Sequence, residues 1–191
     1  MNQPIQQAGA GVKNGIKKLM IVAHPDDELI FGGSLLLEPD WFIISVTNDD
    51  NKIRRKEFRG LMKDLKQNFI MYDHEDTMET DYVDQKTTNK LRKIIENNKK
   101  TLKMIVTHNQ RGEYGHEQHK AVHRAVTKLC KEFGLTKKLH YFKKGTKKLP
   151  AATINRLYEL MKVRYPSQYQ VLDRLKIRGH LEKQTFRPAA K

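Results

Sequence analysis

The sequence predicts an α/β domain with a Rossmann-like, mainly parallel sheet and helices on both faces. Compact apolar runs of strand length alternate along the chain with stretches whose apolar residues recur at helical spacing. Such alternation is typical of parallel sheets covered by helices. The 191 residues suit one domain with a substantial core. Residues 1–16 are polar and contain several glycines, and we expect them to form a flexible leader. No linker or repeat divides the rest of the chain, so we expect a single domain over residues 17–191.

The elements can be assigned in chain order. Short apolar runs predict strands at residues 17–23, 41–48, 68–72, 102–107 and 139–142. Apolar residues at helical spacing predict helices at residues 52–67, 87–97 and 117–133, and a helical region around residues 151–177 that Pro166 interrupts. Residues 29–37 are apolar around Gly32 and Gly33, and a helix behind the Pro25 turn fits them better than a strand. The acidic residues 73–84 are expected to form a loop.

The charge of the chain is strongly asymmetric. Its formal net charge is +15, but residues 128–191 carry 17 Lys and Arg against 4 Asp and Glu, a net +13, which leaves only +2 for the rest. Basic composition suggests nucleic-acid binding, yet such a surface would belong to the basic C-terminal third alone. A solvated basic surface is the simplest interpretation. An anionic substrate or membrane surface comes next, and nucleic acid last.

Three absences suggest a compartment. No apolar run approaches the roughly 18 residues of a membrane span, and residues 1–16 lack the apolar core of a secretory signal. Cys130 is the only cysteine, which excludes an internal disulfide and a multi-cysteine metal site. We therefore expect a cytoplasmic protein.

The first chemical motif is the run from His24 to Glu28, HPDDE, at the carboxyl end of the first expected strand. Ligands of parallel sheets bind at such strand ends. A histidine and a carboxylate three residues apart on a tight turn can point into one site. The alternative is a polar loop in which Asp26 or Asp27 caps the next helix.

The second motif spans residues 107–123, THNQRGEYGHEQHKAVH, and holds four of the eight histidines. His116, His119 and His123 have spacings that share a helix face. A zincin site needs Glu directly after the first histidine of an i, i+4 pair. Lys120 stands there instead, so the zincin interpretation fails. Metal binding or catalysis remains open beside a simple cluster of histidines at a helix end.

The two motifs together suggest a hydrolytic metal site. His24, Asp27 and one histidine of the second motif would form a mixed N/N/O ligand set with a position left for water, as in catalytic zinc sites. Zinc lowers the pKa of a bound water to about 7 and makes it a nucleophile. Asp26 could accept its proton, and a spare histidine could protonate the leaving group.

At this point a resemblance becomes visible. AHPDDE at a strand end, followed by THN-x-x-GEYGH-x-x-H, resembles the PIG-L/LmbE-like family of zinc-dependent N-acetylglucosaminyl deacetylases, from about Lys18 to about Val126. A weaker echo is the run YPSQ, residues 165–168. The resemblance implies zinc ligands, a general base (Asp26) and a histidine that stabilises the oxyanion and protonates the leaving amine (His116). The implied ligands are His24, Asp27 and His119.

The resemblance also implies two substrate contacts. Tyr114 matches a tyrosine near the scissile amide. Arg54 falls in the R-x-x-E stretch of the family, although helical spacing alone suggests a solvated charge. One position departs from the family, because Gln118 stands where many members have Asp. If that Asp keeps the catalytic histidine protonated, the rate should decline above a relatively low pH, and Gln118→Asp should move the decline upward.

We therefore expect a Zn²⁺-dependent hydrolase that removes the N-acetyl group from a GlcNAc-type amino-sugar conjugate. The basic C-terminal third sharpens this to a conjugate with an anionic aglycone. Two alternatives remain, a basic nucleic-acid-binding protein and a catalytically inactive, sugar-binding family member. A nucleotide-dependent oxidoreductase is weaker still, because no G-x-G-x-x-G follows a strand.

Overall fold

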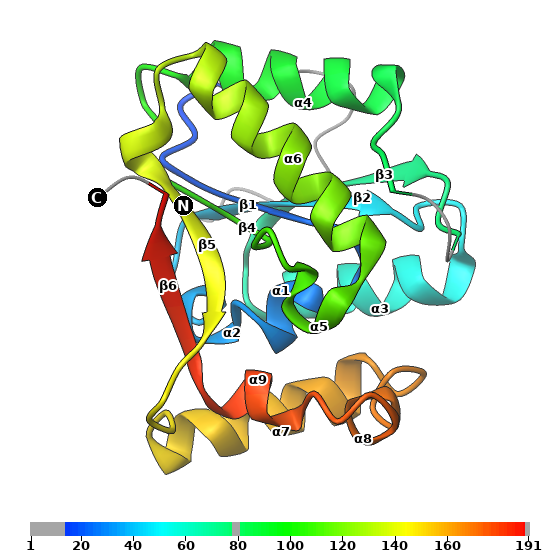
Figure 1. Ribbon diagram of the computed structural model, residues 1–191. Helices are drawn as coiled ribbons and strands as arrows, with labels where there is room; N and C mark the ends of the chain where they lie inside the picture. The colour runs from blue at the N-terminus through cyan, green and yellow to red at the C-terminus, as the bar shows by residue number, and fades with distance from the viewer. Residues whose placement is uncertain (1–13, 78–80, 190–191) are drawn as a thin grey trace, which may run out of the picture.

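A computed structural model describes residues 14–77 and 81–189 and shows one six-stranded sheet between two layers of helices (Figure 1). The strand order is β3-β2-β1-β4-β5-β6, and β1 to β5 pair in parallel while β6 runs antiparallel to β5. This confirms the predicted fold class. The strands are β1 (Lys18–Val22), β2 (Trp41–Thr47), β3 (Asn68–His74), β4 (Met104–Thr107), β5 (Leu139–Lys144) and β6 (Gln184–Pro188).

Helices cover both faces of the sheet, as predicted. α4 (Gln85–Asn98) and α6 (Glu117–Glu132) pack on one face, and α1, α2, α3 and α7 lie on the other (Figure 1). The alternation along β1 serves both layers, because Leu19 and Ile21 join the core under α4 and α6 while Met20 and Val22 join the opposite core. The remaining helices are α1 (Asp27–Ile30), α2 (Gly33–Leu36), α3 (Lys52–Asp64), α5 (Gly112–Gly115), α7 (Ala151–Arg164), α8 (Val171–Arg174) and α9 (Arg178–Glu182).

Side-chain caps fix where two of these helices begin. Oδ1 of Asn51 accepts hydrogen bonds from the backbone N–H groups of Ile53 and Arg54, at 3.1 and 3.2 Å, at the start of α3. Oδ1 of Asp84 accepts from the N–H of Thr87 at 2.7 Å at the start of α4. Such caps satisfy N–H groups that the helix leaves unpaired. The residues between each strand end and its helix therefore stay at the carboxyl edge of the sheet.

The helix expected over residues 29–37 is instead two short helices, α1 and α2, so that expectation was wrong in detail. The break falls at the two glycines, where the chain approaches its neighbours closely. A Cβ on Gly32 would lie 2.8 Å from Cε of Met20 on β1, and one on Gly33 would lie 2.7 Å from Cδ2 of Leu157 on α7. The glycines thus let this segment pack directly on the sheet and on α7.

The two ends of the domain depart from the expected pattern. Ile16, at the end of the expected leader, is buried and its N–H donates to Oδ1 of Asn98 at 2.9 Å, whereas residues 1–13 lie outside the described part of the chain. After α7, the chain forms α8 and α9 and then β6, a strand that the sequence did not predict. Pro188 ends β6, and an edge strand tolerates proline. No described helix is long and apolar enough to cross a membrane.

Candidate active site

Both chemical motifs meet where the strand order reverses, outside the carboxyl ends of β1 and β4. This position is where open α/β sheets bind ligands. The HPDDE motif follows β1 and the GEYGH motif follows β4. They line a cavity of about 580 Å³, to whose wall the C-terminal segment contributes residues between Gln168 and Ile177.

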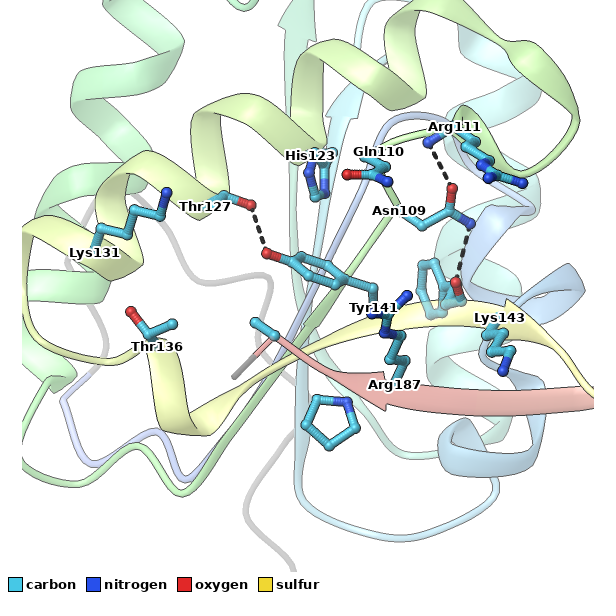
Figure 2. Close-up of a pocket in the computed structure, with 13 residues that line it drawn as sticks. Asn109, Gln110, Arg111, His123, Thr127, Lys131, Thr136, Tyr141, Lys143 and Arg187 are labelled. Carbon is cyan, nitrogen blue, oxygen red and sulfur yellow. Dashed lines mark hydrogen bonds between the residues drawn. The ribbon is translucent and has the colours of Figure 1, made fainter. Parts of the chain in front are cut away.

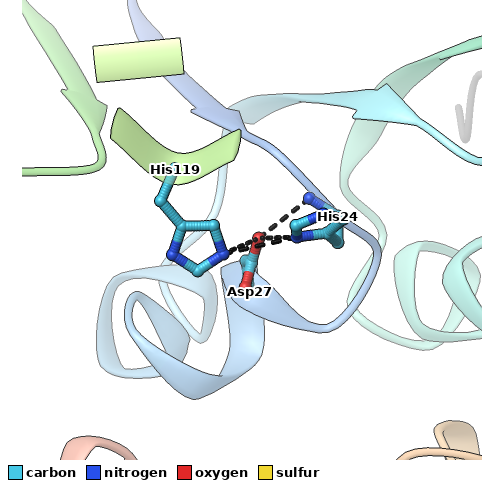
Figure 3. A group of neighbouring side chains, drawn as sticks. All are labelled: His24, Asp27 and His119. Carbon is cyan, nitrogen blue, oxygen red and sulfur yellow. Dashed lines mark hydrogen bonds and ion pairs between the residues drawn. The ribbon is translucent and has the colours of Figure 1, made fainter. Parts of the chain in front are cut away.

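Three side chains of these motifs point at one another (Figure 3). Oδ2 of Asp27 lies 3.2 Å from Nδ1 of His24 and 3.3 Å from Nε2 of His119, and the two nitrogens are 3.3 Å apart. A tetrahedral zinc ion with bonds of about 2.0–2.1 Å separates neighbouring ligand atoms by about 3.3–3.4 Å. The three atoms are therefore spaced as one triangular face of such a tetrahedron would be.

A second group, formed by His108, Glu113 and His119, serves to orient the first. Oε2 of Glu113 lies 2.8 Å from Nδ1 of both histidines, at ordinary hydrogen-bond distance. Nε2 of His108 accepts the N–H of Ala23 at 3.0 Å, so this nitrogen is already engaged. Glu113 thus fixes the ring of His119 with Nε2 turned to the first group, as a carboxylate does behind a metal-binding histidine.

His24 is held from behind in the same way. Its Nε2 lies 3.0 Å from Oδ1 of Asp76, whose other oxygen accepts from the side-chain amide of Asn48 at 3.0 Å. Burial raises the pKa of Asp76, but the hydrogen bonds from His24 and Asn48 outweigh it and lower the pKa to about 2. An ionised carboxylate therefore backs His24 at neutral pH, as Glu113 backs His119.

Asp26 stands beside the ligand group in an unusual backbone conformation, with φ of 104°. Its N–H donates to Oε2 of Glu28 at 3.1 Å, and its Oδ2 lies 3.2 Å from Nη2 of Arg54. Burial raises the pKa of Asp26 to about 7, against the opposing charge of Arg54. A carboxyl group with this pKa can accept and return a proton near neutral pH.

His116 lines the same cavity and caps α6. Its Nδ1 accepts the N–H of Gln118 at 3.2 Å, and its ring centroid lies 4.7 Å from that of His24 and 4.6 Å from that of His119. Burial, together with the charges of His24 and His119, lowers the pKa of His116 to about 4. Tyr114 lies at the mouth, 38% exposed, with its ring centroid 5.4 Å from that of His119.

Arg54 is buried rather than solvated, with 8% exposure. Its Nη2 donates to the carbonyl oxygen of Pro25, and its Nη1 lies 3.6 Å from Oε2 of Glu57. Helical spacing suggested a solvated side chain because it places Arg54 off the apolar stripe of α3 and does not show which other segments pack against it. The tertiary structure turns Arg54 toward the HPDDE loop instead, where it lines the cavity.

The YPSQ segment, residues 165–168, is joined to the same loop. Its Tyr165 hydroxyl donates to Oε1 of Glu28 at 2.5 Å. Its Ser167 donates to Glu57 from both the backbone N–H, at 2.9 Å, and the hydroxyl, at 2.8 Å. This segment, which resembles the family only weakly in sequence, therefore holds Glu28 of α1 and Glu57 of α3 in place next to the cavity.

The structure thus brings His24, Asp26, Asp27, Tyr114, His116 and His119 together in one site. His123 lies outside this site. Nδ1 of His123 donates to the carbonyl oxygen of His108 at 2.9 Å, and its ring faces Tyr141. Sequence reasoning missed the roles of Glu113 and Asp76. Their positions after β4 and β3, at the carboxyl edge, were the available signal.

Comparison with known proteins gives a curated relative and several solved structures. Over 123 residues the chain is 40% identical to an uncharacterized protein of Acanthamoeba polyphaga mimivirus, an alignment covering 55% of this chain and 54% of that protein. The chain therefore spans about half the length of this relative.

Three solved structures share the fold. The conserved protein TT1542 of Thermus thermophilus matches with a TM-score of 0.63 and 17% identity, over 90% of this chain and 93% of that chain. Dbv21, a pseudoaglycone deacetylase for an antimicrobial reagent, matches with 0.62 and 16%, over 84% and 85%. A triple mutant of a deacetylase of the teicoplanin biosynthetic pathway matches with 0.63 and 14%, over 90% and 97%.

A comparison with protein-family models identifies the family. The model described as GlcNAc-PI de-N-acetylase (PIG-L) matches residues 19–130. This stretch covers more than half of the chain and contains both motifs, which confirms the resemblance seen in the sequence. The chain belongs to the PIG-L family.

Proposed function

We propose that the protein is a zinc-dependent N-deacetylase that removes the acetyl group of a GlcNAc-type amino-sugar conjugate. The observation that carries the proposal is the spacing of three ligand atoms, 3.2–3.3 Å apart, which fits one face of a tetrahedral zinc site. The family description names a de-N-acetylase, and two structures with this fold are named deacetylases. These names support the reaction class.

The surrounding residues suit hydrolysis of an amide. Zinc held by His24, Asp27 and His119 would polarise the acetamide carbonyl and activate water for attack. Asp26, with a pKa of about 7, takes up the proton that the attacking water loses. His116 faces the same cavity and supplies a proton to the departing amine. Tyr114, at the mouth of the cavity, would donate its hydroxyl to the developing oxyanion.

The cavity also offers cationic donors for the rest of the substrate. Arg54 lines the cavity, where its buried guanidinium group is held by Pro25, Asp26 and Glu57 and contributes positive charge. Arg174, exposed on α8, lines the same cavity and forms no ion pair within the described part of the chain. Together they favour a conjugate whose aglycone carries negative charge.

The test is an acetate-release assay over a panel of N-acetylglucosamine conjugates, both neutral and phosphorylated. The protein is compared as purified, after chelation and after zinc is restored, and the variants are Asp26→Ala and, as a matched control, exposed Asp50→Ala. We expect release that chelation abolishes, zinc restores, Asp26→Ala removes and Asp50→Ala leaves unchanged. Release that ignores the chelator, or that survives loss of Asp26, would overturn the proposal.

A further inference from the structure

A second cavity, of about 560 Å³, lies between α6 and the β5–β6 edge of the sheet (Figure 2). It shares no lining residue with the candidate active site. α4 and α6 cover the central strands on this face of the sheet (Figure 1), and the cavity lies beside α6, where Tyr141 to Lys143 of β5 and Arg187 and Pro188 of β6 line it. The volume falls within the range of about 300–1,000 Å³ that is usual for small-molecule sites.

The charge of this cavity is entirely positive. Arg111, Lys131, Lys143 and Arg187 line it, and no carboxylate does so in the described part of the chain. Within residues 14–77 and 81–189, none of these four side chains takes part in a hydrogen bond or an ion pair. Positive charge that is concentrated in a concavity focuses its field on an anion.

Nearby acidic side chains do not neutralise it, because they are paired elsewhere. On α6, Glu117 accepts from Lys120 at 2.6 Å, and Glu132 pairs with Arg92. Glu113 is turned the other way, toward His119. The arrangement differs from that of Arg164 and Arg178, each of which pairs with a carboxylate.

The polar wall between the cations is already ordered. The Tyr141 hydroxyl is 3.0 Å from Oγ1 of Thr127, and Figure 2 shows this pair bridging β5 and α6. The Tyr141 ring packs on His123 with centroids 4.6 Å apart. Asn109 donates to the carbonyl oxygen of Phe142 at 3.0 Å and accepts the N–H of Arg111 at 2.8 Å. A preorganised wall lowers the entropy lost when a ligand binds.

We propose that this cavity binds a small molecule bearing a chain of phosphates, either free polyphosphate or the polyphosphate of a nucleotide. Guanidinium groups match phosphate oxygens in a bidentate fork and lysines supply point charges. Four uncompensated cations around one cavity favour a ligand that carries several negative charges. A bounded concavity takes a compact ligand, whereas a nucleic-acid backbone would need an extended basic groove.

The experiment is calorimetric titration of the full chain with inorganic tripolyphosphate at about 0.15 M salt, where the Debye length is about 8 Å and exposed charges are screened. The variant is the double substitution Lys131→Gln and Lys143→Gln. The matched control is Lys100→Gln and Lys162→Gln, which removes two exposed lysines outside the cavity. His24→Ala forms a third arm, because phosphate can also bind a metal.

We expect the cavity double variant to bind tripolyphosphate about tenfold more weakly, and the control pair and His24→Ala to bind it as the unaltered chain does. Equal affinity for ATP would assign recognition to the phosphates alone, and tighter ATP binding would add the nucleoside. Loss of binding at this salt, equal weakening in the control pair, or loss in His24→Ala would overturn the proposal. Tighter binding of a single-stranded oligonucleotide, lost in the cavity variant, would assign the surface to nucleic acid instead.

Discussion

Oε2 of Glu113 lies 2.8 Å from Nδ1 of His119, and this one contact decides which nitrogen of His119 faces Asp27 and His24. Burial raises the pKa of Glu113, but the charges and hydrogen bonds of His108 and His119 lower it to about 2, so the carboxylate is ionised. An ionised acceptor holds the proton of His119 on Nδ1 and leaves Nε2 unprotonated for a metal. The φ of 57° at Glu113 shows that the loop adopts a sparsely populated conformation to place it.

Glu113→Gln should weaken zinc binding by about 10- to 100-fold. Glutamine keeps the size of the side chain but replaces the charged acceptor with a neutral amide, so His119 loses the group that fixes its tautomer. Competition with a chromophoric chelator measures the change. Glu117→Gln is the matched control, because Glu117 is more exposed and, among the described residues, pairs with Lys120 alone; equal zinc affinities in the two variants would contradict the role given to Glu113.

Asp26→Asn should lower the rate of acetate release by about 10²- to 10⁴-fold while zinc binding is retained. The amide cannot accept the proton, and asparagine tolerates the positive φ of this position as well as aspartate does. Metal content is measured beside the rate. A variant that loses zinc together with activity would show that Asp26 holds the ligand group rather than moving a proton.

Gln118→Met should raise the free energy of unfolding by about 1 kcal/mol. The side chain of Gln118 is fully buried, and neither of its polar atoms has a hydrogen-bond partner among the described residues. Methionine has nearly the same shape and avoids the cost of an unpaired amide. Urea denaturation measures the difference, with exposed Gln170→Met expected to change nothing; a destabilised Gln118→Met protein would mean that the amide is satisfied in solution.

The sequence was enough to predict that the two motifs form one site, but it did not indicate the residues, such as Asp76, that hold the motif side chains in place. The two motifs could be placed together because β1 and β4 were expected to end at the same edge of a parallel sheet, whereas the choice of His119 among the histidines of the second motif came from the family resemblance. Asp76 lies in a loop whose fold depends on contacts with Asn48 and His24, and no periodicity reports such contacts. Arg54 is a second example. Its position on a helix is evident from the sequence, but its burial against Asp26 depends on the tertiary structure.

The edge strand β6 was also not predictable from the sequence. β6 has the sequence QTFRP, in which apolar and polar residues do not alternate and the last residue is proline, so it lacks the signal of a strand. It forms because β5 offers an unpaired edge, with which it pairs from His140 to Lys144. Gly32 gave a clearer signal, since its close approach to Met20 is the packing that a glycine next to a sheet suggests.

Gln118→Asp should move the decline of acetate release to higher pH by about one unit. His116 must carry a proton to release the amine, and its pKa is lowered to about 4, so the protonated fraction falls as the pH rises above this value. The N–H of Gln118 donates to Nδ1 at 3.2 Å, so the neutral ring carries its hydrogen on Nε2, and the imidazolium forms only when this contact opens and Nδ1 takes up the second proton. A carboxylate two residues away favours the imidazolium and raises the pKa. The measurement is the rate against pH for both proteins at saturating substrate, with Gln118→Met as the neutral control. Identical declines in the Asp and Met variants would show that His116 is not the acid.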